Sequence, residues 1–383
     1  MRVMISCGEP SGDLYAAALT RELRAQSPAA VITGFGGDHL RAAGAELLGD
    51  FSGLSVTGLL EVVRLLPRTY KMYRHLVASA RRTRPDVFVA IDFPDFNFTL
   101  AKALRKLGIP VVYYISPQLW AWRPGRMHTM RQIADRVLVI FEFEERIYRD
   151  SGVPVEWVGH PLLELTPRSR PKRELVESLG LMNDTPIVAL LPGSRRNELT
   201  ATLPTLVDAV QLVRARVPSA QVVVARAPKL SGDLFAPLER LSAPAVVVEG
   251  RADDVLAVAD VALVASGTVT VQAALHECPM VVVYRLSPLT YRLGRPFVRV
   301  NTFAMANLVA GKAVVPELIQ HDFTAAAVAR EALNILTNPS QAARVQGELR
   351  KVRARLGTPG ASRRAARAVL EIAGGHNRAT SLG

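Results

Sequence analysis

Short apolar runs rich in valine and isoleucine recur along this chain and alternate with segments of helical periodicity. The runs do not alternate between apolar and polar residues, which is typical of parallel strands buried on both faces of a sheet. Strands separated by helices form βαβ units and doubly wound sheets. The sequence predicts strands over residues 3–6, 31–33, 87–91, 111–115, 136–140, 155–158, 187–191, 221–225, 245–249, 261–264 and 280–284.

The length of the chain favours two domains. It has 383 residues, more than a single hydrophobic core usually supports. A polar, proline-rich stretch over residues 166–173 is the best linker candidate. We expect an α/β fold with Rossmann-like domains at residues 1–165 and 174–340, facing a central cleft that holds the ligands. Residues 341–383 are expected to form helices that pack on the first domain or on a partner.

Composition narrows the cellular setting. No apolar stretch reaches the roughly 20 residues that span a bilayer, and residues 1–7 form too short an apolar run for a signal peptide. Cys7 and Cys278 lie among apolar residues and are expected to be reduced thiols of a cytoplasmic protein. The net charge of +13 indicates acidic partners, namely nucleic acid, phosphorylated metabolites or anionic lipid.

Two small-residue turns in the second half each follow an apolar strand and open a helix. Backbone N–H groups at the start of a helix suit an anion, and Arg195 adds a guanidinium fork that fits a diphosphate. Gln272 lies where it can bond ribose hydroxyls. Either turn alone can be an ordinary strand–helix connection, but together they predict a nucleotide site. Its candidates are Gly193, Ser194, Arg195, Ser266, Gly267, Thr268, Gln272 and Asn307.

The first half carries polar and aromatic candidates instead. Residues 7–13 form a turn without the G-x-G-x-x-G pattern, so a dinucleotide fingerprint is disfavoured. Its acidic residues suit a sugar hydroxyl or amine, and the alternative is a capped helix start. Two tryptophans in the loop after residue 115 suit a sugar or acyl pocket, or else a rigid loop packed on the domain. The pocket candidates are Glu9, Ser11, Asp13, Trp120 and Trp122.

Asp92 is the candidate catalytic residue. It ends an apolar strand at the edge where α/β enzymes place catalytic groups, and a desolvated carboxylate there can act as a general base. Asp95 and Asn97 are better explained by turn and helix-cap chemistry. The chain has no HExxH or CxxC motif and no histidine cluster, so no metal is expected.

An aliphatic segment over residues 55–66 precedes a basic helix. A buried helix explains it, and so does an interfacial element that inserts among acyl chains while arginines meet anionic head groups. The candidates for this apolar patch are Leu59, Leu60, Val62, Val63 and Leu66.

Nine short motifs occur in order between residue 8 and about residue 320. They are GEPSGD (8–13), VTGLLEV (56–62), IDFPDFN (91–97), SPQLWAW (116–122), VGHP (158–161), LPGSR (191–195), ASGT (265–268), CPMVV (278–282) and NLVAG (307–311). In this combination the chain resembles the lipid-A-disaccharide synthase family.

The resemblance implies an inverting, metal-independent GT-B glycosyltransferase without a cofactor. It would join UDP-2,3-diacylglucosamine to 2,3-diacylglucosamine 1-phosphate, giving the β-1,6 tetraacyl disaccharide 1-phosphate and UDP in lipid A biosynthesis. By motif position, Asp92 matches the proposed general base, and Arg195 and Asn307 match residues implicated in activity or nucleotide binding. The expected location is peripheral, on the anionic cytoplasmic face of the inner membrane, and a homodimer is left open.

Two positions depart from the family pattern. Gln272 stands where the family usually has glutamate, and Ala306 where it usually has proline, which affects affinity more than reaction type. One alternative is another GT-B sugar-nucleotide enzyme, such as the peptidoglycan N-acetylglucosaminyl transferase or a UDP-N-acetylglucosamine epimerase. A basic nucleic-acid-binding protein would explain the charge but not the paired phosphate turns, so no nucleic-acid partner is expected.

Overall fold

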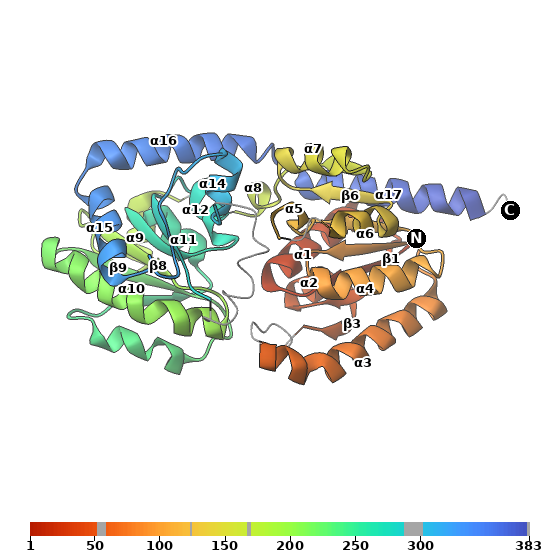
Figure 1. Cartoon of the computed structure of the whole chain (residues 1–383), viewed down its shortest axis with the longest axis horizontal. Helices are drawn as coiled ribbons and strands as arrows, with labels where there is room; N and C mark the ends of the chain where they lie inside the picture. Colours follow the sequence, from red (N-terminus) through yellow and green to blue (C-terminus); the bar gives the residue numbers. More distant parts are fainter. Residues whose placement is uncertain (52–58, 123–124, 167–169, 287–301, 381–383) are drawn as a thin grey trace. The chain divides into compact units, whose positions relative to one another are not determined.

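The computed structural model describes residues 1–51, 59–122, 125–166, 170–286 and 302–380, without the side chains of residues 59–65, 121–122 and 376–380. The described chain forms two compact units. Met1–Glu164 and residues 356–380 make up the first, and the second lies between them in sequence. Each unit is a parallel sheet with helices packed on it (Figure 1).

The first unit contains a seven-stranded sheet with the order β3-β2-β1-β4-β5-β6-β7, in which every pair is parallel. Helices α4 and α17 both contact β4 and β5. Helix α17 packs together with α1, and α4 packs together with α3 and α6, so the sheet is covered by two groups of helices. The strands are β1 (Arg2–Cys7), β2 (Val31–Gly36), β3 (Glu46–Asp50), β4 (Val87–Ile91), β5 (Val111–Tyr114), β6 (Arg136–Val139) and β7 (Val155–Trp157). The helices are α1 (Pro10–Gln26), α2 (Asp38–Ala42), α3 (Leu59–Thr83), α4 (Pro94–Arg105), α5 (Leu119–Trp122), α6 (Arg126–Ile133), α7 (Glu142–Asp150), α8 (Leu162–Leu165) and α17 (Ala361–Thr380).

The second unit repeats this plan with six parallel strands in the order β10-β9-β8-β11-β12-β13. Helices α10 and α15 pack together, and α11 packs against α9 and α12. The strands are β8 (Ile187–Leu191), β9 (Gln221–Arg226), β10 (Val246–Glu249), β11 (Val261–Ala265), β12 (Met280–Tyr284) and β13 (Glu317–Ile319). The helices are α9 (Lys172–Ser178), α10 (Arg196–Arg216), η1 (Gly232–Arg240), α11 (Ala252–Val258), α12 (Val269–Leu275), α14 (Met305–Ala310), α15 (Ala325–Leu336) and α16 (Pro339–Arg355).

All eleven predicted strands are confirmed, and the doubly wound fold class with them. Two strands were missed, β3 and β13, and both lie at the edge of their sheet. An edge strand is covered less completely, so its sequence need not be apolar. Gly49 and Asp50 interrupt the apolar pattern of β3, and β13 is only three residues long.

Both sheets have a topological switch point, where the strand order reverses. In the first it lies between β1 and β4, with Cys7 opposite Ile91. In the second it lies between β8 and β11, with Leu191 opposite Val264. Ligands of doubly wound sheets bind outside the carboxyl ends of the strands at this point. The predicted turns at residues 7–13, 193–195 and 266–268, together with Asp92, follow these four strands.

The C-terminal helices divide between the two units. Helix α16 packs on α12, α14 and α15, so the second unit extends to Arg355 and not to the expected residue 340. Helix α17 packs on α1, β4 and β5 of the first unit. The Glu164 carboxylate fixes its start by accepting hydrogen bonds from the backbone N–H groups of Gly360 (2.6 Å) and Ser362 (2.9 Å).

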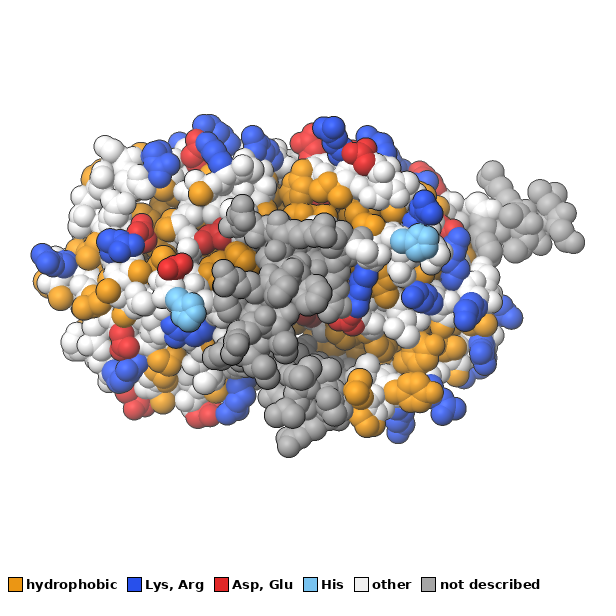
Figure 2. Space-filling view, viewed as in Figure 1, with side chains coloured by type: hydrophobic (Ala, Val, Ile, Leu, Met, Phe, Trp, Pro, Cys, Tyr) orange, Lys and Arg blue, Asp and Glu red, His pale blue; other side chains and the backbone are white. Residues whose placement is uncertain are grey.

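The surface carries many basic side chains. Figure 2 shows Lys and Arg distributed over the visible face of both units. No helix in the described ranges is long and apolar enough to cross a membrane. Cys7 and Cys278 are buried free thiols, and burial raises the pKa of Cys278 to about 12.

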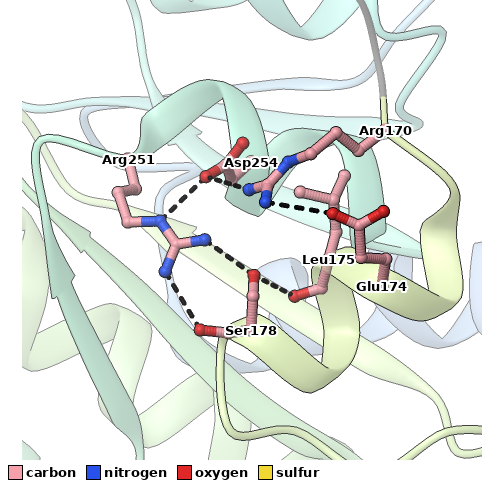
Figure 3. Close-up of polar contacts among 6 residues, drawn as sticks. All are labelled: Arg170, Glu174, Leu175, Ser178, Arg251 and Asp254. Carbon is pink, nitrogen blue, oxygen red and sulfur yellow. Dashed lines mark hydrogen bonds and ion pairs between the residues drawn. The ribbon is translucent and has the colours of Figure 1, made fainter.

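A network of polar side chains holds the end of the predicted linker, at Arg170, against helix α11. The Asp254 carboxylate of α11 accepts hydrogen bonds from Arg251 (2.8 Å) and Arg170 (3.5 Å) (Figure 3). Arg251 also donates to the backbone carbonyl and the hydroxyl of Ser178 at the end of α9. These contacts join α9 to α11, so α9 belongs to the second unit.

Candidate functional site

Asp92 directly follows β4 at the switch point of the first sheet, and its backbone is strained. Asp92 (φ 45°) and Phe93 (φ 48°) are consecutive non-glycine residues in the left-handed region, which L-residues seldom adopt. The carbonyl oxygen of Asp92 accepts hydrogen bonds from the Tyr113 hydroxyl (2.8 Å) and the Asn97 side-chain amide (2.9 Å). Strained turns of this kind cluster at functional sites.

The N-terminal turn lies beside the Asp92 turn. A Cβ on Gly8 would lie 2.2 Å from the ring of Phe93, so only glycine fits beneath that ring. Glu9 and Ser11 are half-buried at the start of α1, next to this contact. The structure thus brings two of the predicted pocket residues close to the candidate base.

Asp13 has a structural role in place of the predicted pocket role. Its side chain is 2% exposed, and it accepts three backbone hydrogen bonds at the start of α2. The donors are the N–H groups of Gly37 (2.7 Å), His39 (2.9 Å) and Leu40 (3.1 Å). The carboxylate caps α2, because a helix start leaves N–H groups without partners inside the helix. Of the two predicted roles, pocket residue and helix cap, the structure shows a helix cap for Asp13. The capped helix is α2, and not α1, in which Asp13 itself lies.

Trp120 lies in the short helix α5 and packs against the core of the first unit. Its indole N–H donates to the Glu144 carboxylate (3.2 Å), and its ring meets Phe143 edge-on at 5.2 Å. Burial raises the pKa of Glu144 to about 7. The Tyr148 hydroxyl donates to the Pro117 carbonyl (3.0 Å) and also bonds Ser116. The rigid-loop alternative describes Trp120, and the Trp122 side chain lies outside the described residues.

The two predicted phosphate turns lie side by side at the switch point of the second sheet. Residues 193–195 follow β8 and residues 266–268 follow β11, which is its hydrogen-bonded neighbour. Gly193 (φ 124°) and Gly267 (φ 154°) both take backbone conformations that favour glycine. The sequence prediction that these turns form one site is consistent with this placement.

Glu198 sits in the first of these turns, and the sequence analysis did not single it out. Its carboxylate accepts from Arg195 Nη1 (2.8 Å) and from the Ser194 backbone N–H (3.2 Å). A Cβ on Gly193 would lie 2.7 Å from the Cβ of Glu198. Glu198 therefore orients Arg195 and shares the donors expected to face a phosphate. An acid three residues after the helix cap was the available signal.

The side-chain amide of Asn307 makes four hydrogen bonds within the protein. Its amide nitrogen donates to the Val315 carbonyl (2.9 Å) and the Glu317 carboxylate (2.6 Å). Its amide oxygen accepts from the N–H groups of Val314 (2.7 Å) and Val315 (3.0 Å). Since the side chain is 1% exposed, Asn307 braces a loop and does not offer its amide to a nucleotide.

Glu317 connects this brace to the second phosphate turn. Its carboxylate accepts from the N–H groups of Phe303 (2.7 Å) and Ala304 (3.2 Å). The Phe303 carbonyl in turn accepts from the Ser266 hydroxyl (3.1 Å). Glu317 begins β13, one of the two missed strands, so its position was not predictable from the strand pattern.

Among the remaining predicted residues, the structure describes the side chains of Gln272 and Leu66. Gln272 donates to Asp253 Oδ1 (3.4 Å), which also contacts His276 Nε2 (3.0 Å). Leu66 is 55% exposed on α3. The side chains of Leu59, Leu60, Val62 and Val63 lie outside the described residues. Within the described ranges, no three His, Cys, Asp or Glu side chains form a metal-ligand group.

The chain is similar in sequence to a family of known proteins. The family model of lipid-A-disaccharide synthetase matches residues 3–372. The chain is 42% identical over 372 residues to the lipid-A-disaccharide synthase of Myxococcus xanthus, covering 97% of each chain. It is 44% identical over 380 residues to that of Koribacter versatilis, covering 97% of this chain and 99% of the relative.

Solved structures are similar in fold. The UDP-GlcNAc 2-epimerase of Neisseria meningitidis has a TM-score of 0.69 at 12% identity, over 97% of this chain and 100% of that one. The calicheamicin glycosyltransferase CalG4 has a TM-score of 0.61 at 16% identity, over 97% and 98%. The two parallel α/β units are those of the GT-B fold. With the match to nearly the whole chain, this glycosyltransferase belongs to the lipid-A-disaccharide synthase family.

Proposed function

We propose that the enzyme transfers diacylglucosamine from UDP-2,3-diacylglucosamine to the 6-hydroxyl of 2,3-diacylglucosamine 1-phosphate, with inversion and without a metal. The bond from the anomeric carbon to UDP breaks as a bond to the acceptor oxygen forms, and the acceptor proton passes to Asp92. The products are the β-1,6 tetraacyl disaccharide 1-phosphate and UDP. The observation that carries this proposal is a carboxylate at one switch point and two phosphate turns at the other.

Charge stabilisation of the leaving UDP falls to the second unit. Arg195 and the backbone N–H groups of residues 267 and 268 are suited to the developing diphosphate charge, whereas the Ser266 N–H donates to the Val283 carbonyl (2.9 Å). Asn307 supports this site through Glu317 without touching the ligand. His160 is a poor candidate for the base, because burial lowers its pKa to about 3.

The decisive experiment is an assay of UDP release with both diacylated sugars. Release is expected only when donor and acceptor are present together. Asp92→Asn should reduce turnover about 100-fold or more while UDP binding is retained, as the loss of a general base predicts. The matched control is Asp95→Asn, whose side chain is 74% exposed nearby. Equal turnover with non-acylated UDP-N-acetylglucosamine would overturn the lipid substrates, and near-normal turnover of Asp92→Asn would overturn the base.

We further propose that α3 meets an anionic membrane surface. Leu66 (55%) and Tyr70 (61%) are exposed large side chains on this helix. Exposed Lys and Arg side chains lie between Leu66 and Tyr70 and further along α3. Figure 2 shows hydrophobic and basic side chains together over this helix, at the lower right. Apolar side chains enter the lipid interface while cations meet anionic head groups. The exposed cations are Arg68, Lys71, Arg74, Arg81 and Arg82.

Sedimentation with lipid vesicles tests this surface. The protein should bind vesicles that contain anionic lipid, and the double variant Leu66→Ser/Tyr70→Ser should bind them less. The control is Leu212→Ser, because Leu212 is an exposed leucine (44%) on α10 of the second unit. Equal vesicle binding by all three proteins would refute the assignment of α3.

A further inference from the structure

We infer that Tyr113 and Asn97 are positioning residues, which hold Asp92 in the backbone conformation that aims its carboxylate. This inference rests on the proposed role of Asp92. Both side chains donate to the same atom, the carbonyl oxygen of Asp92, at 2.8 and 2.9 Å. They come from different elements, Tyr113 from β5 and Asn97 from α4.

The turn requires such support. Asp92 and Phe93 have φ angles of 45° and 48°, and side chains at both positions make this region unfavourable. Such a conformation persists when surrounding contacts over-determine it. A flip of the peptide plane between Asp92 and Phe93 would turn the Asp92 carbonyl away from Tyr113 and Asn97. The two hydrogen bonds therefore oppose relaxation of the turn.

The donors are themselves held in place. Tyr113 and Asn97 are both 0% exposed, so their side chains are confined by the packed interior around them. The Asn97 amide oxygen accepts from the Ser6 hydroxyl (2.6 Å), and its nitrogen also contacts the Ser6 carbonyl (3.2 Å). Asn97 of α4 and Tyr113 of β5 thus converge on the Asp92 carbonyl, and Ser6 of β1 holds Asn97 in place.

This arrangement predicts a defect in catalysis and not in nucleotide binding. The two donors bond the main-chain carbonyl of Asp92. Their loss would widen the range of carboxylate directions and lower the fraction aligned with the acceptor hydroxyl. A small misalignment of a catalytic group lowers rate strongly. UDP binds to residues of the other unit in the proposed mechanism, so its affinity should not change.

Tyr113→Phe is the test, because it removes one hydroxyl and keeps the ring. We expect kcat to fall about fivefold to tenfold, as for the loss of one buried hydrogen bond, with an unchanged Kd for UDP. The matched control is Tyr114→Phe. Tyr114 is the next residue of β5 and is equally buried, and its hydroxyl lies beside Ser362 of α17, on the opposite face of the sheet from Tyr113. This control should retain the parent kcat.

A second arm separates positioning from general structure. If Tyr113 acts through Asp92, adding Tyr113→Phe to Asp92→Asn should not slow the residual turnover further. Hydrogen exchange of the backbone around residues 92–97 should be faster in Tyr113→Phe than in Tyr114→Phe. Parent-like kcat and exchange in Tyr113→Phe would overturn the inference, and so would an undiminished effect in the Asp92→Asn background. If Asp92→Asn alone is fully active, the proposed function fails, while faster exchange would still show that Tyr113 holds the turn.

Discussion

The ring of Phe93 lies directly over Gly8, with ring carbons 2.2 to 2.5 Å from the place where a Cβ on Gly8 would stand. The motifs of residues 8–13 and 91–97 are therefore in contact only because Gly8 has no side chain. Phe93 is also the residue after Asp92 and is part of the same strained turn. Gly8 is consequently tied to the geometry of the candidate base.

Gly8→Ala should lower both stability and turnover. The added methyl group must displace the Phe93 ring, and overpacking of this kind typically costs about 1–3 kcal/mol. Thermal unfolding and UDP release measure the two effects. The control is Gly374→Ala on α17, where a Cβ meets open space. If Gly8→Ala matched this control in both measurements, the contact would have no role in positioning Asp92.

Glu144 should make the first unit less stable as pH rises. Burial raises its pKa to about 7, above the value of about 4.3 in an unfolded chain. The folded state then binds the proton more tightly, so the contribution of Glu144 to stability is largest below about pH 4 and is lost by about pH 7, up to about 4 kcal/mol. Glu144→Gln should remove this component. Urea unfolding followed by tryptophan fluorescence reports the effect, since Trp120, Trp122 and Trp157 all belong to the first unit.

Glu142→Gln is the control for this pH dependence, because Glu142 is exposed on the same helix. It should leave the slope between pH 4 and pH 7 unchanged. An identical slope in Glu144→Gln would show that Glu144 is not protonated in the folded protein over this range.

Glu198→Gln should weaken UDP binding. The Glu198 carboxylate holds Arg195 at 2.8 Å, and the neutral amide would orient the guanidinium less firmly. We expect the Kd for UDP to rise about fivefold, as for the loss of a charge-assisted bond, measured by titration calorimetry. Asp233→Asn, at an exposed carboxylate of the same unit, is the control. Tighter UDP binding by Glu198→Gln would instead show that Glu198 competes with the diphosphate.

Asn307→Asp should destabilise the second unit in a pH-dependent way. It places a second carboxylate where Asn307 Nδ2 now lies 2.6 Å from Glu317, which removes a donor and adds repulsion. We expect a loss of roughly 2–4 kcal/mol near neutral pH. The loss should shrink in acid, as the shared site binds a proton. Hydrogen exchange over residues 303–319 is the measurement, with Asn334→Asp on the exposed side of α15 as control. Equal protection in the two variants would contradict the bracing role of Asn307.

The sequence determined the fold class and the positions of the candidate turns. Apolar runs such as residues 187–191 and 261–265 identify buried parallel strands, because that pattern depends only on local composition. Parallel strands must be joined by crossovers, so the turns after them gather at one edge of a sheet. Asp92, Arg195 and Ser266 could be placed there without knowledge of any contact.

Only the tertiary structure decided what each side chain does. Asp13 caps α2, and Trp120 is fixed by Glu144, since their partners lie more than 20 residues away in sequence. Asn307 braces a loop through residues 7 to 10 positions further on, which only the folded loop brings to its amide. Tyr113 and Glu317 belong to no motif that marks them as functional, yet they bond Asp92 and Asn307. A buried polar group must find a partner wherever the packed chain supplies one. Local pattern thus predicts where a site lies, and packing determines which residues hold it in place.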